Sequence, residues 1–237
     1  MALTPDEQKV ANKAIEFANK NKKQIAKELI EAGSYESEDN PVSVFMAGSP
    51  GAGKTETSKA LIDTFDGGII RIDADDLRDR FEDYNGNNSY LFQASASILV
   101  EKIHDLVLKK NQSFILDGTL TNYNKAVTNI DRSIKRGRPV YILYVYQNPE
   151  LAWEFVQARE IVEGRRVLKS TFLDQYFLAR DVVNNLKAHY KDKIQVELLI
   201  KDSTNSTREY KANIDVIDNH IPESYTRAQL EERLDIS

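Results

Sequence analysis

The stretch VFMAGSPGAGKTETSK, at residues 44–59, holds the densest group of residues in this sequence that could do chemistry. Residues 48–55 match G-x-x-x-x-G-K-[ST], the pattern of a phosphate-binding loop. Glycines let the backbone curl so that its N–H groups point at phosphate oxygens, and the positive end of the following helix adds to the attraction. The pattern therefore predicts a nucleotide-binding loop made of Gly48, Ser49, Pro50, Gly51, Ala52, Gly53, Lys54, Thr55 and Glu56.

Two side chains of this loop have separate predicted tasks. The Lys54 ammonium group can reach the β- and γ-phosphates, and the Thr55 hydroxyl can hold Mg²⁺. We therefore expect ATP and Mg²⁺ as cofactors. The loop alone leaves the destination of the phosphate open, because it occurs in enzymes that transfer phosphate to water, in protein switches and in kinases that phosphorylate a hydroxyl group.

Acidic residues follow the strand-like runs that come after the loop. The segments IDADDLR and ILDGTL would place Asp75 and Asp117 at the carboxyl edge of a parallel sheet, where ligands bind. Asp75 is the candidate general base that takes the proton of an attacking hydroxyl. Asp117 ends an apolar strand as a Walker-B acid does, and it would serve either Mg²⁺ or a substrate hydroxyl. A helix-capping role is the favoured interpretation of Asp76, whereas a site role and a buried hydrogen bond to the backbone are equally favoured for Asp73.

Arginines around a predicted helix end form a second candidate group. In QAREIVEGRRVLK, Arg159 lies on a helical stretch, Gly164 interrupts it, and Arg165 and Arg166 follow. Arginines on both sides of such a break can fold over a nucleotide and neutralise the γ-phosphate in the transition state, an effect of about 10³–10⁵ in rate. The alternative is ordinary surface charge, because Arg159 and Glu163 also make an i,i+4 pair worth about 0.3–0.5 kcal/mol.

The rest of the chain must supply the elements that position these residues. Apolar strand candidates lie at 42–46, 69–72, 114–116, 140–146 and 195–200, and helical patterns lie between them at 54–65, 89–109, 123–136, 149–163 and 169–190. Strands that alternate with helices indicate βαβ units. We therefore predict an α/β P-loop NTPase fold, with a mostly parallel five-stranded sheet, helices on both faces and an N-terminal helical extension.

The predicted segments are an N-terminal helical part at 1–40, a P-loop core at 41–202 and a C-terminal strand and helix extension at 203–237. A capping box from Thr4 to Glu7 begins the first helical pattern, and the polar residues 19–23 leave open whether it forms one helix or two. The segment REYKANI is a candidate for an added strand, and Thr226 for the cap of a last helix.

The composition narrows the class of protein. The 237 residues carry a formal net charge of −5, which argues against broad nucleic-acid binding by the whole fold. Cysteine is absent, so the chain has neither a disulfide framework nor a thiolate metal site. The sequence shows no signal-peptide pattern and no apolar run of membrane-spanning length. We therefore expect a cytoplasmic protein, with neither nucleic acid nor a membrane as its partner.

Two other classes of P-loop protein fit this sequence less well. A GTPase needs a guanine-reading N-K-x-D segment, which the sequence lacks. A hydrolytic motor usually has a glutamate after the Walker-B aspartate to polarise water, and this chain has Gly118 there. An acid after the second strand, together with lid arginines, is typical of a small-molecule kinase that passes the γ-phosphate in line to a bound hydroxyl.

Taken together, these motifs resemble the zeta-toxin family of P-loop kinases. The resemblance runs from about Val42 to Tyr190, and it rests on GSPGAGKTE, IDADDLR, YNGNNSYLFQ, ILDGTL and AREIVEGRRV in this order. The family's best-studied members are bacterial toxins that use ATP and Mg²⁺ to phosphorylate the 3′-hydroxyl of the amino sugar in UDP-N-acetylglucosamine. A small helical antitoxin blocks their nucleotide site. The resemblance therefore implies a UDP-sugar substrate and a separate helical antitoxin as partners.

The resemblance also implies roles for single residues. The second aspartate of the family's D-x-D-x-[FL]-[RK] segment is the catalytic base, which is Asp75 here. Arg78 of the same segment, together with Asp117 and Thr119 of the [ED]-G-T segment, would contact the substrate.

The family's two lid arginines correspond to Arg159 and Arg165, with Arg166 as the register alternative that would bind the nucleotide. With Lys54, these arginines would stabilise the charge of the moving phosphoryl group.

The sequence departs from the family pattern around the acceptor. Asp117 stands where the compared toxins have glutamate, Leu168 where a proline is common, and Phe81 and Glu82 where histidine and proline often occur. The spacing between the lid arginines is also shorter. The alternatives are therefore a kinase of a nucleoside, a dinucleotide or a nucleic-acid 5′ hydroxyl, or a nucleotide-dependent binding module without an acceptor.

Overall fold

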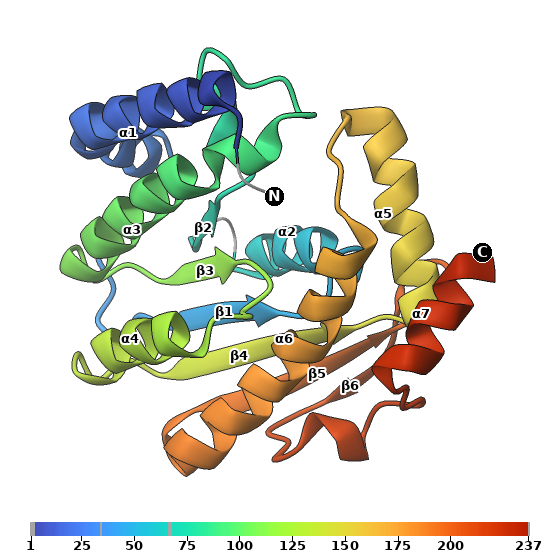
Figure 1. Cartoon of the computed structure of the whole chain (residues 1–237). Coiled ribbons are helices and arrows are strands. Elements are labelled where there is room, and N and C mark those ends of the chain that lie inside the picture. Colours follow the sequence, from blue (N-terminus) through green and yellow to red (C-terminus); the bar gives the residue numbers. More distant parts are fainter. Residues whose placement is uncertain (1–2, 34, 66–67, 237) are drawn as a thin grey trace.

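The computed structural model describes residues 3–33, 35–65 and 68–236, and its centre is a six-stranded sheet (Figure 1). The strand order is β2-β3-β1-β4-β5-β6. The first five strands in that order are parallel, and β6 runs antiparallel to β5. The strands are β1 (Ser43–Ala47), β2 (Ile70–Asp73), β3 (Phe114–Asp117), β4 (Val140–Tyr146), β5 (Gln195–Lys201) and β6 (Thr207–Lys211).

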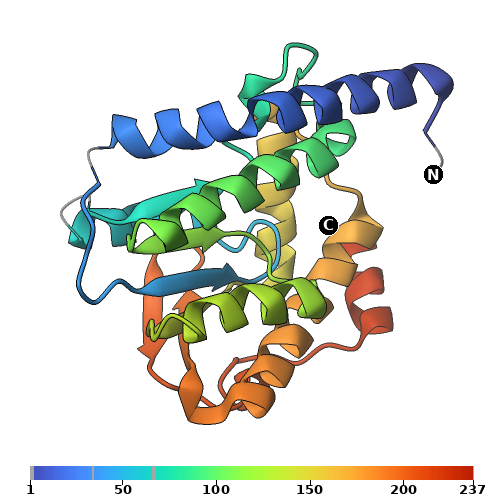
Figure 2. The same ribbon diagram turned by 90° about the vertical axis from the view of Figure 1, so that its left-hand side faces the viewer.

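Helices cover both faces of the sheet, as the alternation of strands and helices predicted (Figure 2). They are α1 (Pro5–Ala32), α2 (Lys54–Thr64), α3 (Gln93–Lys109), α4 (Tyr123–Ile134), α5 (Pro149–Glu163), α6 (Lys169–Tyr190) and α7 (Arg227–Ile236). None of the helices in the described ranges is long and apolar enough to cross a membrane.

The core divides in two because successive side chains of a strand point to opposite faces of the sheet. Phe45 and Phe114 belong to the larger cluster, which also takes in buried side chains of α1, α3, α4 and α6. Val44 and Met46 belong to the smaller cluster, against which α2 packs through Leu61 and Ile62. All five residues of β1 are buried, so the strand that leads into the glycine-rich loop is rigidly enclosed.

The N-terminal pattern forms a single helix, α1, which lies along α3 (Figure 2). Its predicted capping box is confirmed, because the Thr4 hydroxyl accepts a hydrogen bond from the N–H of Glu7 and the Glu7 side chain accepts one from the N–H of Thr4. The polar residues 19–23 do not split the helix. Its buried stripe continues across them from Ala18 to Ile25, so packing against the core holds both halves in line.

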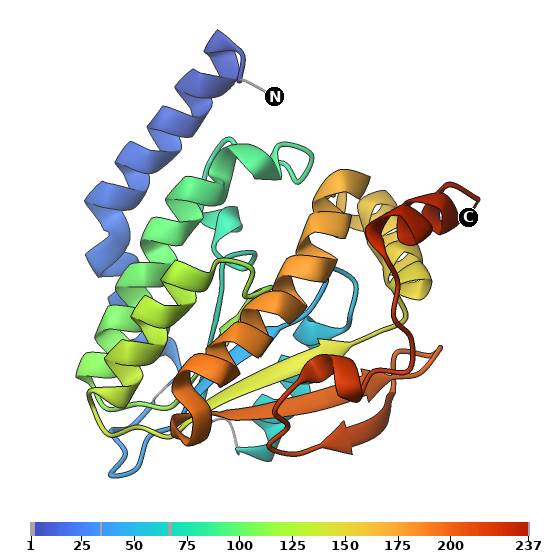
Figure 3. The same cartoon turned by 60° about the horizontal axis from the view of Figure 1, so that its bottom comes forward.

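The predicted count of five strands is wrong by one, because the REYKANI segment contributes β6. This strand pairs with β5 after a tight turn in which the Asp202 carboxylate accepts hydrogen bonds from the N–H groups of Thr204 and Ser206. Figure 3 shows β6 at the edge of the sheet and α7 beside α5 and α6. The division into segments 1–40, 41–202 and 203–237 stays a prediction.

Candidate active site

The glycine-rich loop leads from β1 into α2 and needs glycine at several positions. Gly48, Gly51 and Gly53 have φ angles of 133°, 72° and 84°, which L side chains rarely adopt. A Cβ atom on Gly51 would also lie 2.0 Å from the carbonyl oxygen of Ala152 in α5. The loop is therefore held closely against the start of α5, and side chains at these positions would push it away.

The lysine of the loop folds back over its own turn. The Lys54 ammonium group donates a hydrogen bond of 2.6 Å to the carbonyl oxygen of Ser49. Burial lowers the pKa of Lys54 to about 8, although the negative charges of Asp117 and Asp73 oppose this effect. Lys54 is thus held at the loop. A bound phosphate anion would favour the charged form of its ammonium group and so raise its pKa again.

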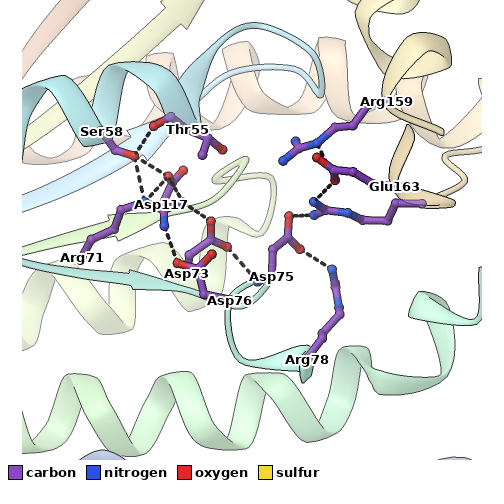
Figure 4. Close-up of polar contacts among 11 residues, drawn as sticks. Thr55, Ser58, Arg71, Asp73, Asp75, Asp76, Arg78, Asp117, Arg159 and Glu163 are labelled. Carbon is purple, nitrogen blue, oxygen red and sulfur yellow. Dashed lines mark hydrogen bonds and ion pairs between the residues drawn. The ribbon is translucent and has the colours of Figure 1, made fainter. Parts of the chain in front are cut away.

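One cavity of about 500 Å³ opens beside the start of α2 and the end of β2. It brings residues of the loop, of the base segment and of the lid together, as Figure 4 shows for Thr55, Asp75 and Arg159. The lining residues are Thr55, Lys59, Asp73, Asp75, Asp76, Asp79, Tyr84, Asn85, Gly86, Arg159, Glu163 and Arg165.

The predicted base, Asp75, lines this cavity and is held by two arginines. One carboxylate oxygen of Asp75 accepts from the Arg78 guanidinium and the other from the Arg165 guanidinium. Arg78 is itself oriented by a hydrogen bond of 2.8 Å to the side-chain oxygen of Gln93. The Asp75 side chain keeps 33% of its surface exposed. Its carboxylate is therefore fixed in direction and still open to the cavity.

The lid arginines meet at a shared glutamate. Helix α5 ends at Glu163, and the next residue, Gly164, turns the chain with a φ of 70°. Glu163 accepts hydrogen bonds from Arg159 at 2.9 Å and from Arg165 at 2.6 Å. Both of these arginines line the cavity, whereas the Arg166 side chain is 70% exposed and lies 3.7 Å from Glu160. The i,i+4 pair expected of a surface helix is thus present, and both of its residues line the cavity.

Three predicted substrate residues, Arg78, Asp117 and Thr119, are not among the residues that line the cavity. Asp117 has a side chain only 3% exposed, and its carboxylate accepts hydrogen bonds from the Ser58 hydroxyl at 2.7 Å and from Arg71 at 3.0 Å. The Thr119 hydroxyl lies 3.3 Å from that of Thr121, and the Thr119 carbonyl oxygen accepts from the N–H of Gly48. The structure therefore places Asp117 at the end of β3, in contact with α2, and Thr119 beside the glycine-rich loop.

Sequence reasoning missed Arg71, which lies at the centre of a polar cluster (Figure 4). Its guanidinium pairs with the carboxylates of Asp73, Asp76 and Asp117, and only 8% of its side chain is exposed. A signal was available, because Arg71 interrupts an apolar strand and Asp73, two residues on, must share its face.

The same cluster decides the roles left open for two aspartates. The favoured capping role for Asp76 is wrong, since its carboxylate pairs with Arg71 and the 3₁₀ turn that follows has Leu77 as its N-cap. Asp73 does accept a hydrogen bond from the backbone, which is partly buried and measures 2.8 Å from the N–H of Asp75, and it also pairs with Arg71.

Two acidic side chains stand side by side in this cluster. Asp73 and Asp117 are partners in the register between β2 and β3. Burial and, next, the charge of Asp117 raise the pKa of Asp73, the charge of Arg71 opposes them, and the resulting pKa is about 6. Arg71 therefore offsets only part of the cost of placing two carboxylates together.

The part of the chain that the structure describes holds no group of three or more histidine, cysteine, aspartate or glutamate side chains that could bind a metal. The predicted protein ligands of a Mg²⁺ ion stay the Thr55 hydroxyl and, as the second candidate, the Asp117 carboxylate, with phosphate oxygens and water for the other positions. The residues present fit such an ion, because Thr55 lines the cavity.

The sheet order, the glycine-rich loop and the lid define the class: this is a P-loop protein with the architecture of the small P-loop kinases. Residues 26–215 match the family model described as Zeta toxin, and the chain therefore belongs to the zeta toxin family. The predicted family and fold are both confirmed.

Solved structures support the fold. A chain of the PezAT chromosomal toxin–antitoxin system of Streptococcus pneumoniae matches with a TM-score of 0.65 and 17% identity, over 99% of this chain and 94% of that chain. The AvrRxo1-ORF1:AvrRxo1-ORF2 structure with sulphate ions matches with a TM-score of 0.58 and 16% identity, over 97% of this chain and 72% of that chain. The AvrRxo1-ORF1:-ORF2 structure with ATP matches with a TM-score of 0.56 and 15% identity, over 98% and 73% of the two chains. No curated protein sequence matches the chain at a significant level.

Proposed function

We propose that this chain is an ATP- and Mg²⁺-dependent kinase that transfers the γ-phosphate to a hydroxyl group of a small molecule. The observation that carries the proposal is the single cavity in which Thr55 of the phosphate-binding loop, the carboxylate of Asp75 and the lid arginines Arg159 and Arg165 meet. Membership of the zeta toxin family and the likeness to a structure with ATP support it.

The triphosphate would be bound by the backbone of the loop and by Lys54, which would turn from the Ser49 carbonyl oxygen to the phosphates. The Thr55 hydroxyl would hold Mg²⁺, which would supply positive charge against the phosphates. Arg159 and Arg165 would stabilise the charge that spreads over the moving phosphoryl group. These electrostatic groups should contribute most to the rate, because the transition state of phosphoryl transfer is loose.

Asp75 would take the proton of the acceptor hydroxyl, and its arginines suggest how it becomes available. Both oxygens of the Asp75 carboxylate are occupied by Arg78 and Arg165. A γ-phosphate in the cavity would compete for Arg165, since arginine binds phosphate oxygens as well as carboxylates. One oxygen of Asp75 would then be open to the hydroxyl, while Arg78 would keep the carboxylate in place.

The acceptor that we propose first is the 3′-hydroxyl of the amino sugar in UDP-N-acetylglucosamine or a related UDP-sugar. This choice rests on the family and on the motifs that carry the resemblance. Asp79, Tyr84 and Asn85 line the cavity beside Asp75 and are the candidates to contact the acceptor. A nucleoside, a dinucleotide or a nucleic-acid 5′ hydroxyl is the alternative acceptor.

An acceptor screen tests the proposal. The protein is incubated with labelled ATP, Mg²⁺ and a panel of UDP-sugars, nucleosides and dinucleotides, and the products are read by mass spectrometry. We expect Lys54→Ala and Asp75→Asn to abolish transfer, and the exposed substitution Asp105→Asn to leave it unchanged. Near-normal transfer by Asp75→Asn would show that the base is wrongly assigned. Tight ATP binding with no phosphorylated acceptor would favour the binding module.

We further propose that the chain acts in the cytoplasm as the toxin of a toxin–antitoxin pair, with a separate helical antitoxin. The likeness to a chain of the PezAT system supports this role. Expression in bacteria without an antitoxin should arrest growth, and the Lys54→Ala variant should not. Equal growth arrest by both proteins would exclude kinase activity as its cause.

A further inference from the structure

Arg71 links three carboxylates to the helix that follows the phosphate-binding loop, and the proposed reaction assigns it no task. We propose that Arg71 is a positioning residue of the phosphoryl-transfer site. It holds Asp117 against Ser58 and thereby fixes the first turn of α2, where Thr55 lies. The kinetic part of this inference rests on the proposed function, whereas its nucleotide-binding part does not.

The fold places the Arg71 side chain on the face of the sheet that α2 covers. Its neighbours Ile70 and Ile72 belong to the larger core cluster, so Arg71 and Asp73 point to the opposite face, toward α2. Only 8% of the Arg71 side chain is exposed. A guanidinium so deeply buried is tolerated only with anionic or hydrogen-bonding partners, and the three carboxylates supply them.

The contacts of Arg71 use the whole guanidinium fork. Its Nε lies 2.9 Å from the Ser58 hydroxyl and 3.0 Å from the Asp117 carboxylate. One terminal nitrogen bridges Asp117, at 2.9 Å, and Asp73, and the other pairs with Asp76. A lysine offers a single point charge in place of this planar set of donors, so it could hold only part of the arrangement.

These contacts reach the predicted Mg²⁺ ligand through the backbone. Ser58 lies three residues after Thr55 in α2, with its hydroxyl 3.0 Å from the Thr55 carbonyl oxygen, and the single proton of that hydroxyl goes to the Asp117 carboxylate at 2.7 Å. Arg71, Asp117 and Ser58 therefore brace the turn that carries Thr55 (Figure 4). In this arrangement Asp117 supports the ion site through Ser58 of α2, as outer-shell partners of metal sites do.

The register between β2 and β3 explains why a cation is needed at this point. Asp73 and Asp117 are partners in that register, and both side chains are almost fully buried. Without Arg71, two like charges would face each other in a region of low dielectric constant, and one carboxylate would have to take up a proton or turn away. If Asp117 turned, Ser58 would lose its hydrogen-bond partner. The turn of α2 that carries Thr55 would then no longer be held in place.

Four variants test this inference. Arg71→Met removes the charge at similar length, Arg71→Lys keeps the charge without the fork, and Arg71→Met with Asp73→Asn removes the cation and one carboxylate together. Arg80→Met is the matched control, because Arg80 is exposed and pairs with Glu28. Asparagine at position 73 can still accept the hydrogen bond from the N–H of Asp75.

Each variant is measured in three ways: the affinity for a fluorescent ATP analogue with and without Mg²⁺, the kcat of ATP consumption with the identified acceptor, and the melting temperature. Mg²⁺-dependent tightening is the factor by which Mg²⁺ increases the affinity for the ATP analogue. We expect Arg71→Met to lower both this factor and kcat by about 10–100-fold. The double variant should recover most of this loss, Arg71→Lys should be intermediate, and Arg80→Met should match the wild type.

The outcomes separate this inference from the proposed function. Wild-type Mg²⁺-dependent tightening in Arg71→Met would overturn the positioning role, and a double variant no better than Arg71→Met would overturn the role of its charge. If Arg71→Met does not fold, Arg71→Lys carries the test, and wild-type tightening and kcat in that variant would overturn the inference. A wild-type protein that phosphorylates no acceptor would end the proposed function alone, because the binding measurements would still decide the role of Arg71.

Discussion

The carboxylate of Asp73 should cost the folded protein stability, and Asp73→Asn should recover it. Asp73 is buried next to Asp117, and this environment raises its pKa from 3.8 to about 6. The folded chain therefore binds a proton more tightly at this position than the unfolded chain does. Between these two pKa values stability falls as the pH rises, because the folded state holds the proton that the unfolded state has released.

The magnitude follows from the difference between the two pKa values. A pKa raised by about 2 corresponds to about 3 kcal/mol at 1.36 kcal/mol per unit. The attraction of Arg71 is already included in the raised pKa, so we expect Asp73→Asn to gain up to about 3 kcal/mol above pH 6.5 and almost nothing near pH 4. In a chain of this size each kcal/mol raises the melting temperature by about 2–4 °C.

The assay is thermal unfolding of the wild type and Asp73→Asn from pH 4 to pH 8, with the difference plotted against pH. Asp76→Asn is the matched control, since Asp76 also pairs with Arg71 but its side chain is largely exposed. We expect this control to change stability by less than about 1 kcal/mol at every pH. A difference between Asp73→Asn and the wild type that is zero, negative or independent of pH would refute the reasoning.

Three further predictions concern the loop and the lid. Gly51→Ala should weaken ATP binding at least about tenfold, because a strained φ costs about 1–2 kcal/mol and the new Cβ atom would meet a backbone carbonyl oxygen 2.0 Å away. Gly137→Ala, with a similar φ of 68° but open space around it, should bind ATP normally in the same fluorescence titration, and equal losses in both variants would contradict this account. The pKa of Lys54 is lowered to about 8, so ATP affinity should fall as the pH rises through 8, and a flat profile from pH 7 to pH 9.5 would show that the Lys54 charge does not bind phosphate. Arg165→Ala should lower kcat by about 10³-fold or more, and Arg166→Ala by less than about twofold; the reverse order in a steady-state assay would mean that the lid turns the other way when ATP binds.

Much of the fold was accessible from local patterns. The starts and ends of the five parallel strands fall within one residue of their predicted ranges, because apolar runs bounded by glycine, proline and acidic residues mark buried strands. The sixth strand gave only a weak signal, since four of its five residues are exposed and Tyr210 is the only apolar or aromatic residue among the five. Its place depends on the hydrogen bonds that β5 offers at the edge of the sheet.

The candidate site was accessible only in part. The phosphate-binding loop and the base segment are continuous motifs, so their residue types and spacing were enough to select Lys54, Thr55 and Asp75 for the predicted site. The sequence marks Arg71 as a charge in an apolar strand, but it does not give the role of this residue, because that role depends on side chains elsewhere in the chain. Asp117, its partner at 3.0 Å, lies 46 residues further on.

Features built from sequence neighbours, such as the capping box at Thr4 and the glycine turns of the loop, follow from the chain itself. Their hydrogen bonds and φ angles are local, so no distant contact is needed to produce them. Two contacts depend on packing: the one between Arg165 and Asp75, which lie 90 residues apart, and the one between Asp117 and Ser58. Both require β3 to lie between β1 and β2 and the lid to fold over the end of the sheet, and charges far apart in the chain meet only once that core has formed.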